Sequence, residues 1–262
     1  MTNRPPLHWR EYAIEAALLG MFMISAAVVT TFVDHPSSPL RQLLPETFAR
    51  RALTGLAMGL TAAALVYSPW GRRSGAHFNP SVTLTFYRLG KIRGRDAAGY
   101  VAGQFAGAVA GIAVAAAFLS PWIADPTVSF VATRPGPSGE VAAFAGELGI
   151  SFLLMLTVLT VSNHARLTRF TGVVAACLVA SFITFEAPLS GMSMNPARSF
   201  GPSLVSGLAP GLWLYFVAPP AGMLLAAEVY LRVKGRVAIH CAKLQHAGPC
   251  IFNCAFDRIE TS

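Results

Sequence analysis

Two short motifs repeat the same polar residues at the same spacing. Ser-Gly precedes Asn-Pro by the same offset in residues 74–80 and in residues 190–196. Asparagine is a strong helix cap and proline is favoured at the first helical position, so each motif predicts the start of a helix. The N-terminus of a helix carries a partial positive charge, which gives each motif an electrostatic role.

The chain on either side determines where these two helix starts lie. The apolar residues that follow the motifs, 82–87 and 200–205, are too few to span a membrane but enough to enter one halfway. Each motif follows the second of three apolar segments, and three spans reverse the orientation of the second half, so the halves form an inverted repeat. We therefore expect the two helix N-termini to meet near the bilayer midplane.

The composition is that of a membrane protein. Hydrophobic residues make up 54% of the chain and charged residues 12%, against roughly 25% charged in a soluble domain. A helix needs about 20 apolar residues to cross a bilayer. Six segments approach or exceed that length: 11–33, 48–69, 97–119, 140–161, 170–187 and 209–231.

The net charge of +8 is distributed unevenly between the connections. Fifteen Lys and Arg residues fall on the side of the two termini, against five on the other side: Arg41, Arg50, Arg51, Arg134 and Arg198. This bias predicts a multi-pass protein of the cell (inner or plasma) membrane with both termini in the cytoplasm. The basic residues are not interleaved with aromatic or amide side chains, so we do not expect nucleic-acid binding.

Over about residues 11–231 the sequence resembles the aquaporins and glycerol facilitators of the major intrinsic protein family, in their bacterial form. The resemblance rests on Ser-Gly-Ala-His-Phe-Asn-Pro at 74–80 and on Gly-Met-Ser-Met-Asn-Pro-Ala-Arg-Ser-Phe-Gly-Pro at 191–202. The first motif departs from the family pattern, because Ser81 stands where alanine is usual. A small hydroxyl should still fit between the half-helices.

The resemblance implies an all-α membrane fold of six transmembrane helices, in which two re-entrant half-helices complete a seventh span. It implies a passive channel for water, small uncharged solutes such as glycerol-like polyols, or both, which excludes protons and ions and requires no cofactor. It also implies a homotetramer in the lipid bilayer. The motif residues would line the pore, and the two asparagine amides would donate hydrogen bonds to passing molecules: Asn79, Pro80, Ser81, Asn195, Pro196 and Ala197.

The same resemblance assigns a selectivity filter. Arg198 would be its charged member, and spacing places Met192 and Ile183 beside it. The fourth position is Met58 by pattern or Gly59 by ungapped counting, and Met58 is favoured. Because methionine adapts to irregular shapes, this apolar ring favours solutes larger than water. The alternative is that the methionines only pack into the wall.

Two acidic residues fall inside apolar segments, where a carboxylate is costly and therefore a functional candidate. Glu15 and Glu147 occupy comparable places early in each half. The resemblance implies that they accept hydrogen bonds from the motif loops. His77 belongs either to the cytoplasmic vestibule or to the same bracing of the loops.

The predicted organisation is a cytoplasmic N-terminal segment (1–10), a channel domain (11–232, repeats about 11–119 and 140–232) and a cytoplasmic tail (233–262). A pore does not account for the residues found in this tail. It carries Cys241, His246, Cys250 and Cys254, which could form a site for zinc or iron. The alternative is an ordinary tail with free thiols.

Two other functions remain open. Inverted repeats also build secondary transporters of small solutes, which would need ion ligands at the midplane. A membrane scaffold or sensor could act through a metal- or redox-responsive tail. The sequence contains no nucleophile–base pair and no phosphate-binding loop, so an enzyme is not expected.

Overall fold

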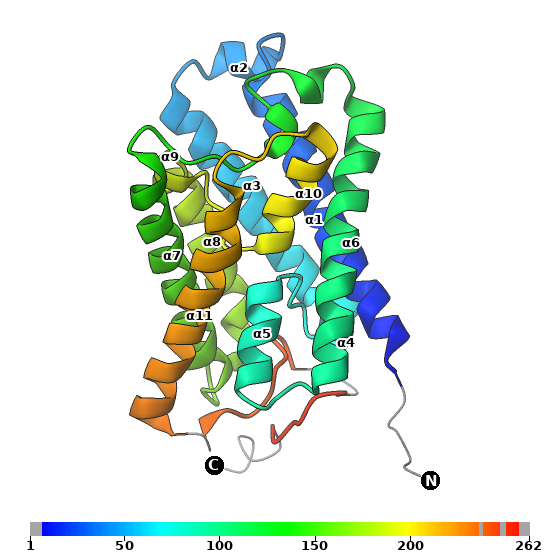
Figure 1. The fold of residues 1–262 in the computed structure, drawn as a ribbon, viewed down its shortest axis with the longest axis vertical. Coiled ribbons are helices and arrows are strands. Elements are labelled where there is room, and N and C mark those ends of the chain that lie inside the picture. Colours follow the sequence, from blue (N-terminus) through cyan, green and yellow to red (C-terminus); the bar gives the residue numbers. More distant parts are fainter. Residues whose placement is uncertain (1–6, 236–237, 247–249, 257–262) are drawn as a thin grey trace.

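The computed structural model describes residues 7–235, 238–246 and 250–256, and within them it contains helices and no strands. Two shorter helices, α5 (Pro80–Arg88) and α10 (Pro196–Ser206), lie inside a bundle of six long ones (Figure 1). Short segments connect them: α2 (Pro39–Leu43), α4 (Pro69–Ser74), α9 (Ala187–Ser190), and 3-10 turns at Trp122–Ala124, Ser129–Val131 and Thr168–Phe170. The long helices are α1 (Trp9–Asp34), α3 (Thr47–Tyr67), α6 (Gly94–Leu119), α7 (Gly139–Ser162), α8 (Thr171–Phe185) and α11 (Leu212–Lys234).

Within the described residues, five helical segments are long and apolar enough to cross a membrane: α1, α6, α7, α11 and Thr168–Phe185, which contains α8. The helix α3 is less apolar because Arg50 and Arg51 lie in its first turns. Arg50 is satisfied within the protein, since its guanidinium donates to the Asp34 carboxylate at 2.9 Å and to two backbone carbonyls. α3 therefore accommodates Arg50, and Arg51 lines the cavity described below, so the helix lies close to the predicted span at 48–69.

Two predicted spans include residues that form turns in the structure. The span expected at 170–187 ends at Phe185, because the chain leaves α8 there and forms the separate turn α9. The span expected at 209–231 begins at Leu212, after Gly211 with a φ of 61°, and continues to Lys234.

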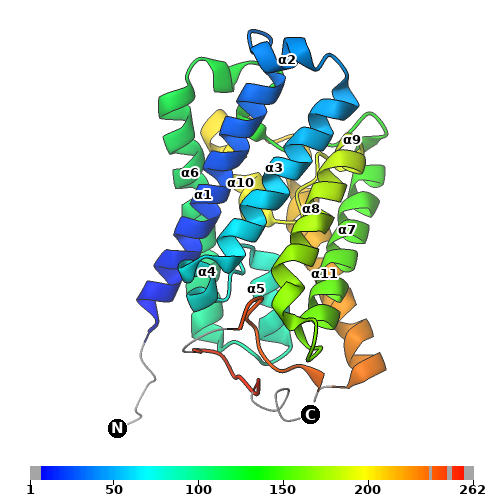
Figure 2. The same cartoon turned by 180° about the vertical axis from the view of Figure 1, so that it is seen from behind.

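Contacts within each half and between the halves build the bundle. Within the halves, α1 packs along α6 and α7 along α11, and between the halves α3 packs against α8. Each short helix contacts the last long helix of the opposite half, α5 on α11 and α10 on α6. α5 enters from the end where the described tail lies, here called the tail end, and α10 enters from the opposite end (Figures 1 and 2). This is the inverted arrangement that the repeated motifs predict.

Glycines allow the closest helix contacts. A Cβ added to Gly107 of α6 would lie 2.0 Å from the backbone oxygen of Ala16 in α1. A Cβ on Gly55 of α3 would lie 2.5 Å from the oxygen of Ala180 in α8. Small residues at such crossings let helix backbones approach in lipid, where dispersion and not the hydrophobic effect drives packing.

We expect Gly107→Ala to destabilise the bundle by about 1–3 kcal/mol, because the added methyl forces α1 and α6 apart. Thermal unfolding in detergent, followed by circular dichroism, should show a lower midpoint. Gly149→Ala in α7 is the matched control, because a Cβ there meets nothing within 4 Å. An equal loss of stability in both variants would contradict the close-packing argument.

Candidate pore and the residues that line it

Each motif forms the capped helix start that its residues predict. The Asn79 side-chain oxygen accepts the backbone N–H of Ser81 at 2.8 Å, directly before α5. The Asn195 oxygen accepts the N–H groups of Ala197 and Arg198 at 3.1 and 3.2 Å, before α10. The prolines follow at the first position of each helix. The cap therefore fixes each amide at a helix N-terminus.

The two asparagines also join the halves. The Asn79 Nδ2 donates to the Met194 carbonyl at 2.7 Å, and the Asn195 Nδ2 donates to the Phe78 carbonyl at 2.8 Å. Each amide thus uses one of its two N–H donors in a hydrogen bond to the opposite loop. The two helix starts face each other in the centre of the bundle, as the inverted repeat predicts.

The loops before the helices adopt unusual backbone conformations. Ala76, Phe78, Met192 and Met194 all have positive φ angles, between 27° and 56°. Such angles are unfavourable for residues other than glycine and persist where surrounding structure enforces them. The matching positions in the two loops show that the repeat extends to backbone geometry.

Glu15 holds the first loop in this shape. Its fully buried carboxylate accepts hydrogen bonds from the Ser74 hydroxyl and from the backbone N–H groups of His77 and Phe78, at 2.6–3.1 Å. The Gln104 amide donates to the same carboxylate at 2.7 Å. A buried carboxylate with these donors is stabilised by hydrogen bonds to its charged form.

Glu147 occupies the equivalent place in the second half. It accepts from the Ser190 hydroxyl at 2.9 Å and from the N–H groups of Ser193 and Met194 at 2.6 and 2.7 Å. Sequence reasoning missed the tyrosines that hold the other side of each loop. Tyr100 and Tyr215 donate their hydroxyls to the carbonyls of Ser74 and Ser190. A repeated tyrosine about 20 residues after each asparagine was the available signal.

A cavity of about 330 Å³ runs past both motifs. Asn79, Asn195, Met194 and Phe78 line it where the loops meet. The cavity is also lined by the four residues that the family resemblance assigned to one filter: Met58, Ile183, Met192 and Arg198. The structure brings these four together on one cavity, from α3, α8, the second motif loop and α10.

Met58 and Gly59, the two candidates for the fourth filter residue, lie in different environments in α3. Met58 lines the cavity and is 3% exposed. Gly59 packs against α8, where an added Cβ would lie 2.8 Å from the Ala176 oxygen. Its place in the helix contact explains why a glycine stands there.

Arg198 is oriented by a residue that the sequence did not indicate. Its guanidinium donates to the Val131 carbonyl at 2.9 Å. Ser129, Phe130 and Val131 have three consecutive positive φ angles, which fold this connection so that Val131 lines the cavity. A backbone acceptor carries no side-chain signature, so a sequence cannot reveal it.

The residues after the asparagines form the contact between the half-helices. Ser81 and Ala197 are both fully buried, and Pro80 and Pro196 at the helix starts are also buried. Within the described part of the chain, the Ser81 hydroxyl has no hydrogen-bond partner. Serine therefore fits where alanine is usual, at the cost of a buried unsatisfied hydroxyl.

His77 lies where the first loop meets the tail. Its ring contacts the Thr83 hydroxyl at 3.1 Å and the Ala242 carbonyl at 2.8 Å. It stacks between Phe86 and Phe252, with centroids 5.2 and 5.5 Å away. His77 also lines the cavity.

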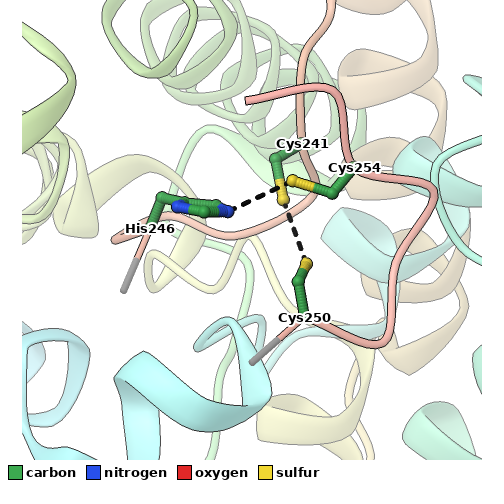
Figure 3. Close-up of side chains that lie close together, drawn as sticks. All are labelled: Cys241, His246, Cys250 and Cys254. Atoms are coloured by element: carbon green, nitrogen blue, oxygen red, sulfur yellow. Dashed lines mark hydrogen bonds between the residues drawn. The ribbon is translucent and has the colours of Figure 1, made fainter. Parts of the chain in front are cut away.

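The four candidate ligands of the tail come together (Figure 3). Their ligand atoms all lie within 4.8 Å of one another, in Cys241, His246, Cys250 and Cys254. The hydrogen bond from the Cys241 thiol lowers the pKa of Cys250 to about 5, and the same bond together with burial raises the pKa of Cys241. Burial lowers the pKa of the nearby Lys243 ammonium.

Inverted three-helix halves, with two half-helices meeting at paired asparagines beside a lined cavity, define a class of membrane-protein fold. The family model described as "Major intrinsic protein" matches residues 6–230. The chain therefore belongs to the major intrinsic protein family.

Individual relatives agree with this assignment. The chain is 36% identical to the aquaporin NIP3-1 of Arabidopsis thaliana over 194 residues, which cover 71% of this chain and 59% of that protein. It is 39% identical to a probable aquaporin, AqpM, of Archaeoglobus fulgidus, over 67% of this chain and 74% of that one. The aquaglyceroporin structure from Plasmodium falciparum superposes with a TM-score of 0.68 at 19% identity, covering 87% of this chain and 98% of that one. This last likeness concerns the fold alone.

Proposed function

We propose that this protein is a passive transmembrane channel for water and small uncharged solutes. The observation that carries the proposal is the cavity on which both asparagine amides and Arg198 converge. The donors are held rigidly by caps, cross-loop bonds and buried carboxylates. Fixed donors can replace the hydrogen bonds that a molecule loses when it leaves bulk water.

The mechanism follows from the direction of these donors. Each asparagine amide gives one N–H to the opposite loop and keeps the second for the oxygen of a passing molecule. A water that accepts from Asn79 and Asn195 points its own hydrogens outward from the centre, which interrupts a proton-conducting chain. The two positive helix ends and the Arg198 cation add an electrostatic barrier to cations.

The filter composition favours solutes larger than water. Met58, Ile183 and Met192 supply apolar, partly deformable walls, and Arg198 supplies one set of donors. A polyol can place its hydroxyls on the arginine and its carbon chain against these walls. Stopped-flow light scattering on proteoliposomes tests this, and we expect fast uptake of both water and glycerol. Water flux without glycerol flux would overturn the broad-filter proposal, and no flux of either would overturn the channel.

We expect Met192→Phe to reduce glycerol flux by at least about tenfold and water flux by much less, because a rigid ring narrows the filter. The same proteoliposome assay measures both fluxes. Met21→Phe is the control, since Met21 lies outside the residues that line the cavity. Equal loss of water and glycerol flux would mean that the substitution blocks or unfolds the pore rather than altering its selectivity.

Other assignments belong to the same proposal. We place both termini in the cytoplasm of a cell-membrane protein, with a channel domain at 11–232 between tails at 1–10 and 233–262. Conduction needs no cofactor, and the protein acts as a channel and not as an enzyme. Large apolar side chains such as Phe118 (80% exposed) and Phe185 (71%) cover the outside and suit lipid or neighbouring copies in a homotetramer.

A coupled transporter is less well supported than a channel. Coupling requires carboxylates that are available to an ion or a proton at the midplane. Glu15 and Glu147 are instead engaged with three or four donors each from the loops and α6. Uptake that collapses on addition of a protonophore would favour the transporter.

A further inference from the structure

Most of the described tail, residues 238–246 and 250–256, is neither helix nor strand. It nevertheless brings four potential metal-ligand side chains close together. The Cys241 and Cys250 sulfurs lie 3.5 Å apart, and the His246 Nε2 lies 3.1 Å from the Cys254 sulfur. All four side chains point toward one another from two passes of the chain (Figure 3). The four cysteines of the protein are free thiols.

The distance between the Cys241 and Cys250 sulfurs matches an edge of a tetrahedral metal site, and the other ligand atoms need small side-chain shifts to reach the remaining corners. Zinc binds sulfur at about 2.3 Å and histidine nitrogen at about 2.0–2.1 Å, which places neighbouring ligand atoms roughly 3.5–3.8 Å apart. Three thiolates and one imidazole form a ligand set typical of structural zinc. Soft thiolate ligands disfavour magnesium and calcium, which prefer oxygen.

The histidine is held in a ligating orientation. The His246 ring stacks on Phe256 with centroids 4.0 Å apart and planes 8° from parallel. Cys241 is 4% exposed, while His246 and Cys250 are half-buried and Cys254 is exposed. One side of the cluster is thus packed into the protein, and the other remains accessible to an ion from solution.

The same segment is attached to the loops at the tail end. The Leu244 N–H donates to the Gly75 carbonyl at 3.1 Å, beside the first motif. The Asn253 backbone N–H and side-chain amide donate to the carbonyls of Lys91 and Gly90, between α5 and α6. The His240 N–H donates to the Asn163 side chain, after α7. Three separate loops around one end of the cavity therefore hold the tail.

Leu244 lies at the cavity itself. It is 7% exposed and lines the same cavity as Asn79 and Asn195. Its position falls between Cys241 and His246, two of the clustered side chains. A cross-link through these residues therefore restrains a residue that lines the cavity.

We propose that Cys241, His246, Cys250 and Cys254 bind one zinc-type ion, and that the bound metal keeps Leu244 in the tail-end entrance so that conduction falls. The closing role rests on the proposed channel function, whereas the metal site does not. Metal-free protein loses the cross-link between the two passes of the tail, because binding and ordering are coupled at such sites. If zinc binds the closed state about 10⁴-fold more tightly than the open state, it moves an equilibrium of 1:99 (closed to open) to 99:1.

Metal binding is tested on the full-length protein in detergent, reduced and stripped with a chelator. Added Co²⁺ should give sulfur-to-metal charge-transfer bands and intense tetrahedral d–d bands, saturate at one ion per chain, and be displaced by Zn²⁺. Cys250→Ser should lose these bands. Cys177→Ser is the matched control, because Cys177 lies in α8 outside the tail. Absence of the bands, their persistence in Cys250→Ser, or a Cys241–Cys250 disulfide in place of metal would overturn the site.

The closing role is tested by water flux in proteoliposomes, with zinc equilibrated across the membrane by an ionophore or removed by a chelator. We expect zinc to lower the flux of the wild type by about tenfold or more. Leu244→Ala should bind Co²⁺ as the wild type does and yet conduct equally with and without zinc. Equal flux of zinc-loaded and zinc-free wild type would overturn the closing role.

The two proposals fail in different ways. If neither zinc-free wild type nor Leu244→Ala conducts water or glycerol, the channel function fails and the closing role fails with it. The cobalt spectrum decides the metal site independently of any flux.

Discussion

Glu147→Ala should lower the stability of the protein by several kcal/mol and reduce water flux by at least about tenfold, since each buried donor left without an acceptor costs about 1–3 kcal/mol. The substitution leaves the N–H groups of Ser193 and Met194 and the Ser190 hydroxyl without their carboxylate. The positive φ angles of Met192 and Met194 then lose the contacts that enforce them. Thermal unfolding in detergent and flux in proteoliposomes measure the two effects.

Two variants separate this explanation from a general effect of removing an acid from α7. Glu140→Ala removes an exposed carboxylate whose partner is the Trp213 indole, and we expect a change within about 0.5 kcal/mol. Glu147→Gln keeps one acceptor oxygen and should fall between Glu147→Ala and the wild type. A fully active, stable Glu147→Ala would show that the loop holds its shape without the carboxylate.

Arg198→Ala should admit cations while water continues to pass. A unit charge about 4 Å from a permeating cation contributes roughly 4 kcal/mol to the barrier at an effective dielectric constant of about 20. Because about 1.4 kcal/mol corresponds to a factor of ten, cation leak should rise by at least about tenfold and by up to about a thousandfold. The positive helix N-termini at Asn79 and Asn195 still repel cations in the variant, so the increase in leak can be as small as about tenfold. Sodium and proton fluxes into proteoliposomes, measured with trapped fluorescent indicators, test this.

The control is an arginine at the same end of the molecule that does not line the cavity. Arg134 is exposed, and its guanidinium donates to the Ser129 hydroxyl. Arg134→Ala changes the net charge by the same amount and should leave cation leak unchanged. An equal leak in the two variants would assign the barrier to surface potential and not to the filter. Arg198→Lys should retain most of the barrier, because the charge remains while the fixed guanidinium geometry is lost.

Much of the fold could be predicted because its causes are local. The spans follow from runs of apolar residues, and the half-helices follow from an asparagine cap and a proline at 79–80 and 195–196. The inverted relation follows from repeating one motif after an odd number of spans. The bounds near Phe185 and Leu212 were predicted less well, although the sequence carries breakers at both places: Glu186 and Pro188 follow α8, and Pro210 and Gly211 precede α11.

The candidate site was predicted unevenly. Asn79 and Asn195 belong to the two motifs, and Arg198 lies directly after the second, so all three could be identified from local sequence alone. Met58 and Gly59 differ by one position, and a shift of one residue turns a helix position by about 100°. The packing of α3 on α8 places Met58 on the cavity.

By itself the sequence determined that the chain crosses a membrane, that two capped half-helices face each other, and that the tail contains metal-ligand residue types. These properties depend on residue type and spacing along the chain. The tertiary structure decided that the Val131 carbonyl orients Arg198, that His77 binds the Ala242 carbonyl, and that Leu244 lines the cavity. Those contacts join residues far apart in the chain, often through backbone atoms that every residue carries, so no pattern of side chains could specify them.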